Sequence, residues 1–236
     1  MNSAVSQMAF QLKLGQVVPD FEINTTQGKM RLHDFIKKDT DTKPYTILVS
    51  HPADYTPVCT TELGKVESLT DRFTKRGVKL LGISTDSLDD HKTWSKDIMH
   101  REKKQGEKLS FPIIADESRE ITNAMGLLDP STSDAPCDMM SGRAMIVFDK
   151  SCRVRVGFLY PVTTGRNFNE VLRVIDSLRM ADEHKVVTPV DWKPGDKVLI
   201  PPSVSNEDAK KLFGDIETEP LPSGRDYMRF ARVRGE

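Results

Sequence analysis

The feature that most constrains the fold is the alternation of short apolar runs with longer amphipathic segments. Runs of strand length and composition cover Tyr45–Ser50, Val78–Ser84, Arg143–Asp149 and Arg153–Tyr160. The last two are separated only by Lys-Ser-Cys, which is short enough for a hairpin. Strands that alternate with helices favour an α/β fold, and a closing hairpin makes its central sheet mixed.

Three segments between or after these runs have features of helices. Thr60–Lys75 places apolar residues at intervals of three and four. A second segment follows Ser87 and has Asp90 three residues later, and a third follows Asn167 and has Glu170 three residues later. This spacing of a capping residue and an acidic residue is typical of a helix start. We expect these helices to flank the sheet.

The chain changes character near Val187. Six of the 14 prolines lie between Pro189 and Pro222, and helical periodicity is weak there except in Glu207–Phe213. Proline-rich sequence with little periodicity is typical of an arm or a small domain. We therefore expect an α/β domain over residues 10–186 and a C-terminal arm or small second domain over residues 187–236.

Charge and hydropathy argue against several classes of function. The chain has 34 basic and 35 acidic residues, so it lacks the basic excess of a nucleic-acid-binding protein. No segment approaches the ~18 consecutive apolar residues of a membrane span. The first fifteen residues lack both the basic start and the apolar centre of a secretory signal. We expect a cytoplasmic protein that neither binds nucleic acid nor inserts into a membrane.

The cysteines and histidines give no sign of a metal site. The three cysteines, Cys59, Cys137 and Cys152, include no C-x-x-C pair, and a small odd number fits a reducing compartment. The five histidines are scattered, without metal-ligand spacing. We expect no metal and no other cofactor.

Cys59 lies where a strand gives way to a helix. Thr56 is the predicted N-cap, with its hydroxyl accepting a backbone N–H, and Pro57 then takes the first helical position. Cys59 falls in the first turn, where the partial positive charge of the helix favours a thiolate. The alternative is a buried cysteine that acts as a small apolar residue.

The spacing Pro52-x-x-x-Thr56-x-x-Cys59 resembles the active-site motif of the peroxiredoxin family. Longer stretches resemble its one-cysteine, peroxiredoxin 6 type branch, and the resemblance runs from about Leu14 to Phe230. These stretches are HPADYTPVCTTELG, PDFEINTTQGKMRLHDF, DHKTWSKDI, FPIIAD, LYPVTTGRNFNEVLRVIDSL and TPVDWKPGDKV. The resemblance implies a thioredoxin-like fold and a thiol peroxidase that reduces hydrogen peroxide and organic hydroperoxides. It also implies a homodimer in which the C-terminal extension packs across the partner.

The resemblance assigns roles to four residues. Cys59 matches the peroxidatic cysteine, whose thiolate attacks the peroxide and becomes a sulfenic acid. Thr56 matches the residue that orients the peroxide, and Pro52 the residue that shields the thiolate from water. Arg143 matches the arginine that keeps the thiolate ionised and stabilises charge on the leaving oxygen. Taken alone, Arg143 would be interpreted as a surface arginine at the start of a strand.

Three further residues are expected to support the site. His51 matches a histidine beside the proline in this branch, and a core histidine bonded to the backbone is the alternative. Glu62 is interpreted as a structural partner in the first turn of the helix. Arg166 matches a second arginine near the site, and the alternative is a residue before a helix that pairs with a carboxylate.

The chain departs from some relatives in ways that bear on function. His33 matches a histidine linked to phospholipase activity in this branch, but no G-x-S-x-G element occurs. No cysteine follows Cys152, and Cys137 has acidic neighbours that oppose a thiolate. We therefore expect an external thiol, such as glutathione or thioredoxin, to reduce Cys59. The alternatives are a phospholipid hydrolase and a non-enzymatic chaperone-like or redox-signalling protein.

Overall fold

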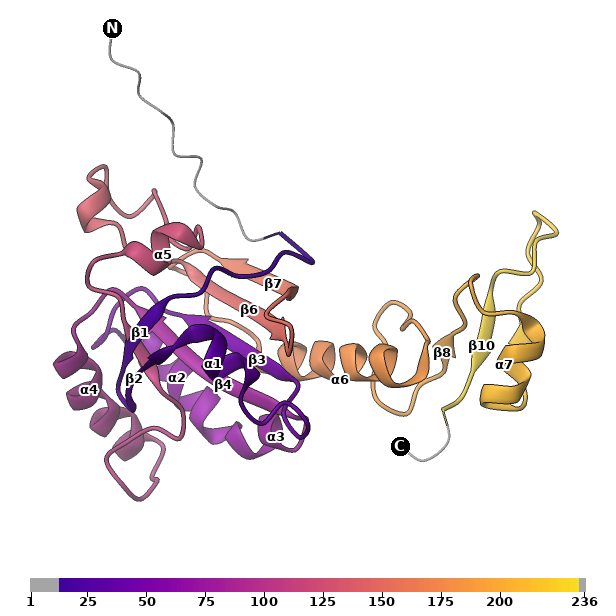
Figure 1. The fold of residues 1–236 in the computed structure, drawn as a ribbon, viewed down its shortest axis with the longest axis horizontal. Helices are drawn as coiled ribbons and strands as arrows, with labels where there is room; N and C mark the ends of the chain where they lie inside the picture. Colours follow the sequence, from indigo (N-terminus) through magenta and orange to yellow (C-terminus); the bar gives the residue numbers. More distant parts are fainter. Residues whose placement is uncertain (1–12, 234–236) are drawn as a thin grey trace, which may run out of the picture. The chain divides into compact units, whose positions relative to one another are not determined.

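The structure is a computed structural model that describes residues 13–233 (Figure 1). The expectation that no secretory signal begins the chain falls mostly on residues outside this range. Backbone contacts divide the chain into two units between Arg166 and Asn167, ahead of the boundary expected at Val187. No helix within residues 13–233 is long and apolar enough to cross a membrane.

The first unit contains a seven-stranded mixed sheet with the order β2-β1-β5-β4-β3-β6-β7. Its strands are β1 (Glu22–Thr25), β2 (Gly28–Arg31), β3 (Tyr45–Ser50), β4 (Val78–Ser84), β5 (Ile113–Ala115), β6 (Arg143–Asp149) and β7 (Val154–Tyr160). β3, β4 and β5 are parallel neighbours, whereas β6 is antiparallel to both β3 and β7. The expected strands are confirmed, the last one beginning one residue later than predicted.

Strand β3 lies inside this sheet, between β4 and β6, and all six of its residues are buried. It leads the chain into the loop before the helix that carries Cys59. Ser50, its last residue, fixes the start of that loop. Its hydroxyl donates to Gly142 O at 2.5 Å and accepts from Ala144 N at 2.8 Å. The end of β3 is thereby tied to the start of β6.

Besides a 3-10 helix at Pro136–Asp138, residues 13–166 of the same unit form five α-helices, which Figure 1 shows around the sheet. They are α1 (Leu32–Lys37), α2 (Pro57–Ser68), α3 (Thr70–Thr74), α4 (Leu88–Arg101) and α5 (Glu120–Ala124). The single helix expected over Thr60–Lys75 is interrupted at Leu69, whose φ of −101° and ψ of 2° leave the helical region. The predicted cap of α4 is confirmed, because the Ser87 hydroxyl accepts from Asp90 N at 3.1 Å.

The second unit has its own elements and its own core. It contains α6 (Phe168–His184), α7 (Asn206–Phe213) and a three-stranded sheet with the order β8-β10-β9. The three strands are β8 (Val198–Leu199), β9 (Glu217–Thr218) and β10 (Arg229–Ala231). A buried cluster includes Met180 of α6 together with Trp192, Val198 and Phe213. The last turns of α6 therefore share a core with residues after Val187.

Candidate active site

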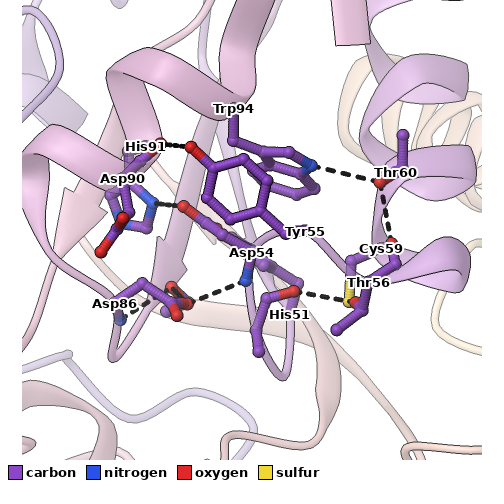
Figure 2. Close-up of polar contacts among 12 residues, drawn as sticks. His51, Asp54, Tyr55, Thr56, Cys59, Thr60, Asp86, Asp90, His91 and Trp94 are labelled. Carbon is purple, nitrogen blue, oxygen red and sulfur yellow. Dashed lines mark hydrogen bonds and ion pairs between the residues drawn. The ribbon is translucent and has the colours of Figure 1, made fainter. Parts of the chain in front are cut away.

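Cys59 is the third residue of α2 and is completely buried. Thr56 is the N-cap residue, with extended backbone angles, and Pro57 opens the helix, as predicted. Figure 2 shows the sulfur atom of Cys59 close to Thr56. The thiol therefore lies in the first turn, where aligned peptide dipoles favour a negative charge.

The predicted hydrogen bond of the Thr56 hydroxyl is wrong. This hydroxyl makes no capping bond and instead donates to Ala53 O at 2.9 Å. The carbonyl of Thr56 accepts from both the backbone N–H and the hydroxyl of Thr60, at 3.0 and 2.8 Å. Because the hydroxyl proton is used by Ala53, the Thr56 oxygen keeps its capacity to accept a hydrogen bond.

Arg143 begins β6 and is only 3% exposed, so the interpretation as a surface arginine is wrong. Its Nε and Nη2 atoms donate to Val162 O at 2.9 and 2.7 Å. Its Nη1 atom donates to Glu62 Oε2 at 2.8 Å and lies 3.4 Å from Cys59 Sγ. The guanidinium is thus held on two sides while one nitrogen contacts the sulfur.

Glu62 lies between two arginines. Arg166 donates from its backbone N and from Nε to Glu62 Oε1 at 2.7 and 3.0 Å, and from Nη2 to Oε2 at 2.8 Å. Its remaining Nη1 donates to Ala144 O at 2.7 Å. Both interpretations of Arg166 therefore hold, since it pairs with a carboxylate and that carboxylate also binds Arg143.

The charges of this buried cluster are unequal. Two guanidiniums face one carboxylate, which leaves one positive charge beside the Cys59 sulfur. Uncompensated charge is costly in the interior of a protein, so a thiolate at Cys59 would neutralise the cluster. Burial raises the pKa of the Glu62 carboxyl, but the hydrogen bonds and charge of Arg166 and the charge of Arg143 outweigh it. The pKa of Glu62 consequently lies below its ordinary value.

His51 is buried, but its partner is a side chain rather than the backbone. Its Nε2 atom lies 2.7 Å from Asp54 Oδ1, and Asp54 Oδ2 lies 2.6 Å from His91 Nδ1 (Figure 2). The three residues offer two ring nitrogens and a carboxylate, the usual donors for a transition metal. These nitrogen–oxygen contacts have the length of hydrogen bonds, which describes a hydrogen-bonded triad.

Four other residues considered from the sequence form no hydrogen bond with the Cys59 sulfur among the described residues. Pro52 is buried in the loop between β3 and α2. The free Cys137 thiol is exposed, whereas burial raises the pKa of the Cys152 thiol at the turn between β6 and β7. The ring of His33 faces Val18 O at 2.7 Å.

Comparisons with known proteins show which family this chain is similar to. The model of the AhpC/TSA family matches residues 14–156, and that of the C-terminal domain of 1-Cys peroxiredoxin matches residues 177–215. Peroxiredoxin-6 of Homo sapiens is 48% identical over 221 residues, covering 93% of this chain and 96% of that protein. 1-Cys peroxiredoxin B of Oryza sativa subsp. japonica is 47% identical over 223 residues, covering 94% and 98%.

Solved structures give the same result. A crystal structure of a cysteine-to-serine mutant of the peroxiredoxin 6 of Arenicola marina superposes with a TM-score of 0.89 at 42% identity, covering 95% of this chain and all of that one. A yeast mitochondrial 1-Cys peroxiredoxin has a TM-score of 0.79 at 36% identity, covering 94% and 100%. In that yeast protein, thiol resolution proceeds via glutathione/thioredoxin systems.

We predict that Glu62→Gln destabilises the protein in a pH-dependent way. At neutral pH the variant removes the carboxylate that pairs with two buried guanidiniums, which should cost about 3–5 kcal/mol of unfolding free energy. Because the folded-state pKa of Glu62 lies below the ordinary 4.5, the wild-type advantage is complete above pH 4.5 and is lost as pH falls through the lower value. Urea unfolding at neutral and acidic pH measures the difference.

The matched control is Glu107→Gln, which removes a carboxylate from an exposed pair with Lys96. Surface substitutions of this kind change stability by about 0.5 kcal/mol or less. A difference between wild type and Glu62→Gln that stays constant well below pH 4.5 would contradict the assignment.

Proposed function

The chain belongs to the peroxiredoxin family, and on that premise we propose how its buried cysteine and arginines reduce a peroxide. It is a thiol-dependent peroxidase with a single peroxidatic cysteine that external thiols restore. The contact that carries the assignment of Cys59 is the 3.4 Å approach of Arg143 Nη1 to its sulfur.

The reaction starts from the Cys59 thiolate. The sulfur attacks the terminal oxygen of hydrogen peroxide or an organic hydroperoxide, an S–O bond forms and the O–O bond breaks. Cys59 becomes a sulfenic acid, and the second oxygen leaves as hydroxide or alkoxide and takes a proton from water. The products are water or an alcohol.

The neighbouring groups would each serve one part of this step. Arg143 stabilises the thiolate and then the charge that develops on the leaving oxygen. Thr56 has its proton committed to Ala53, so its oxygen can accept the hydrogen bond of a peroxide O–H. Pro52 lies buried in the same loop, where its ring would limit the access of water to the sulfur. Glu62 and Arg166 hold Arg143 in position.

The sulfenic acid is returned to the thiol by a reductant from outside the chain. Cys152 is buried and Cys137 has acidic neighbours, so neither has the properties of an activated thiol. We propose glutathione or thioredoxin as the reductant. The three free thiols fit a reducing compartment, and we place the protein in the cytoplasm.

The assembly we propose is a homodimer to which residues 187–236 contribute. β7 lies at one end of the seven-stranded sheet and exposes Leu159, and the C-terminal extension exposes Val190. An edge strand with an exposed apolar side chain is a ready site for pairing with another chain. Both features support a second copy of this chain as the partner.

We predict that Cys59→Ser abolishes peroxide consumption, whereas the double variant Cys137→Ser, Cys152→Ser turns over nearly as fast as wild type with a small dithiol. Without a reductant, excess peroxide should carry Cys59 on to the sulfinic acid, because no internal thiol traps the sulfenic acid. Mass spectrometry of the treated protein identifies the product. Accumulation of a Cys59–Cys137 disulfide would overturn external resolution.

We predict that Arg143→Lys lowers kcat/KM for peroxide by about 10²-fold while the protein stays folded. A lysine ammonium is a point charge and cannot bind Val162 O, Glu62 and the sulfur together, as the planar guanidinium does. Stopped-flow kinetics measure the rate, and circular dichroism checks the fold. The control is Arg153→Lys, at an exposed arginine bonded to Gly15 O, which should react like wild type.

We predict that deletion of residues 187–236 shifts the protein from dimer towards monomer in sedimentation velocity. The deletion also removes Trp192 and Phe213 from a small core, so a point variant is needed beside it. Val190→Lys changes a side chain that is 87% exposed and leaves that core intact. Wild-type dimer affinity in both variants would assign the extension another purpose.

A further inference from the structure

Asp54 ties the active-site loop to a different helix. Its carboxylate bridges His51, which precedes it in the loop, and His91, which lies on α4 (Figure 2). All three side chains are at most 1% exposed. The loop that Asp54 anchors also contains Pro52 and Thr56, so this bridge sits between α4 and the residues that would receive the peroxide.

The hydrogen bonds of His91 require a shared proton. Its Nε2 atom lies 3.1 Å from Ile114 O, and a carbonyl oxygen only accepts, so Nε2 carries a hydrogen. The Nδ1 atom of a neutral ring would then present a lone pair to Asp54 Oδ2 at 2.6 Å. Two lone pairs repel at that distance, so one proton must lie between these atoms, whether it is drawn on the ring or on the carboxyl.

The protonation state of His51 determines how many protons the triad holds. Burial lowers its pKa, although the hydrogen bond and charge of Asp54 oppose the shift, so the ring is neutral. It donates its Nε2 hydrogen to Asp54 Oδ1, and its Nδ1 has no hydrogen-bond partner among the described residues. The triad therefore holds one proton more than an ionised Asp54 and two neutral rings would.

Few other charges face this triad in the described part of the chain. The Asp86 carboxylate accepts the Asp54 N–H at 3.1 Å, and its negative charge opposes the lowering of the His51 pKa by burial. From α4 come Asp90, whose carboxylate is bonded to Ser87, and Trp94, whose indole lies 5.2 Å from the His51 ring. The Tyr55 hydroxyl is 3.5 Å from Asp90 O.

One residue of this loop, Tyr55, has an unfavourable backbone conformation. Tyr55 has a φ of 55°, in the left-handed region that a tyrosine adopts only where its surroundings impose it. A second connection to α4 runs from Trp94 Nε1 to the Thr60 hydroxyl at 3.1 Å, and from that hydroxyl to Thr56 O at 2.8 Å. Hydrogen bonds to α4 thus hold the loop at Asp54, before the strained Tyr55, and at Thr56, after it.

We propose that Asp54 and His91 are positioning residues of the peroxidase reaction, and that the proton they share locks the loop of Pro52 and Thr56 in its reactive arrangement. The inference rests on the peroxidase function proposed above. When alkaline pH removes the proton, two lone-pair atoms face each other and the bridge opens. Peroxide reduction then slows even though Cys59 remains a thiolate, and kcat/KM has an alkaline limb.

The variant Asp54→Asn keeps the hydrogen-bonded bridge but removes its titratable proton. The amide can donate Nδ2–H to His91 Nδ1 and accept from His51 Nε2, so it replaces the shared proton by one that does not titrate. This variant should lose less activity at neutral pH than Asp54→Ala, and its alkaline limb should disappear. Asp54→Ala removes the bridge, and misplacement by about 1 Å lowers rates about 10²-fold, so its kcat/KM should fall at every pH.

The matched control is Glu67→Gln. Glu67 is also a buried carboxylate, 1% exposed on α2, and it accepts from Lys104 and Ser110 rather than from the active-site loop. Its substitution should leave the pH profile of kcat/KM unchanged. If Asp54→Asn kept the alkaline limb at the wild-type midpoint, if Asp54→Ala matched wild type, or if wild type had no alkaline limb, the proposal would be wrong.

A second measurement does not depend on turnover. In Cys59→Ser protein, proton NMR should show a strongly deshielded ring N–H for the short His91–Asp54 contact, and Asp54→Ala should lack it. Absence of that signal from Cys59→Ser protein would exclude the shared proton, even if the wild-type protein has normal peroxidase activity. Conversely, a wild-type protein that shows the signal but consumes no peroxide would refute the peroxidase function and leave the shared proton standing.

Discussion

The site depends on the burial of Glu62 between Arg143 and Arg166. The carboxylate uses both of its oxygens, and each guanidinium is also bound to a backbone carbonyl, so none of the three charges can turn away. A buried ion pair contributes little net stability against apolar residues of the same volume. Its value here is orientation, because it fixes one nitrogen of Arg143 beside the Cys59 sulfur. The excess positive charge is the reason a thiolate fits this position.

The sequence predicts those features that local patterns determine. β3, β4, β6 and β7 are long and apolar, and the caps of α4 and α6 have the residues that bind free N–H groups, so all of them appear where expected. β5 has three residues and β8 has two, too few for a periodic pattern, and they form only because neighbouring strands pair with them. The end of α2 at Leu69 likewise has no glycine or proline from which it could be predicted.

Within the site, a contact could be predicted from the sequence only where the two residues lie close together in the chain. The Thr-Pro start of α2 is a local signal and places Cys59 correctly. The contact of Arg143 with Cys59 spans 84 residues, and only resemblance to a family pointed to it. Asp54 and His91 are 37 residues apart, and neither has neighbours that mark it as a bridge. The Thr56 hydroxyl was expected to accept a backbone N–H of the helix, and instead it donates to Ala53 O in the preceding loop.

The charge count also bears on the step that follows attack. While Cys59 is a thiolate, Glu62 and the sulfur together balance Arg143 and Arg166. A sulfenic acid is neutral, so its formation returns one positive charge to the buried cluster. An incoming reductant attacks as a thiolate, and its negative charge compensates the two arginines as the first thiolate did. The two arginines that would balance a Cys59 thiolate therefore also favour the approach of the external thiol that restores it.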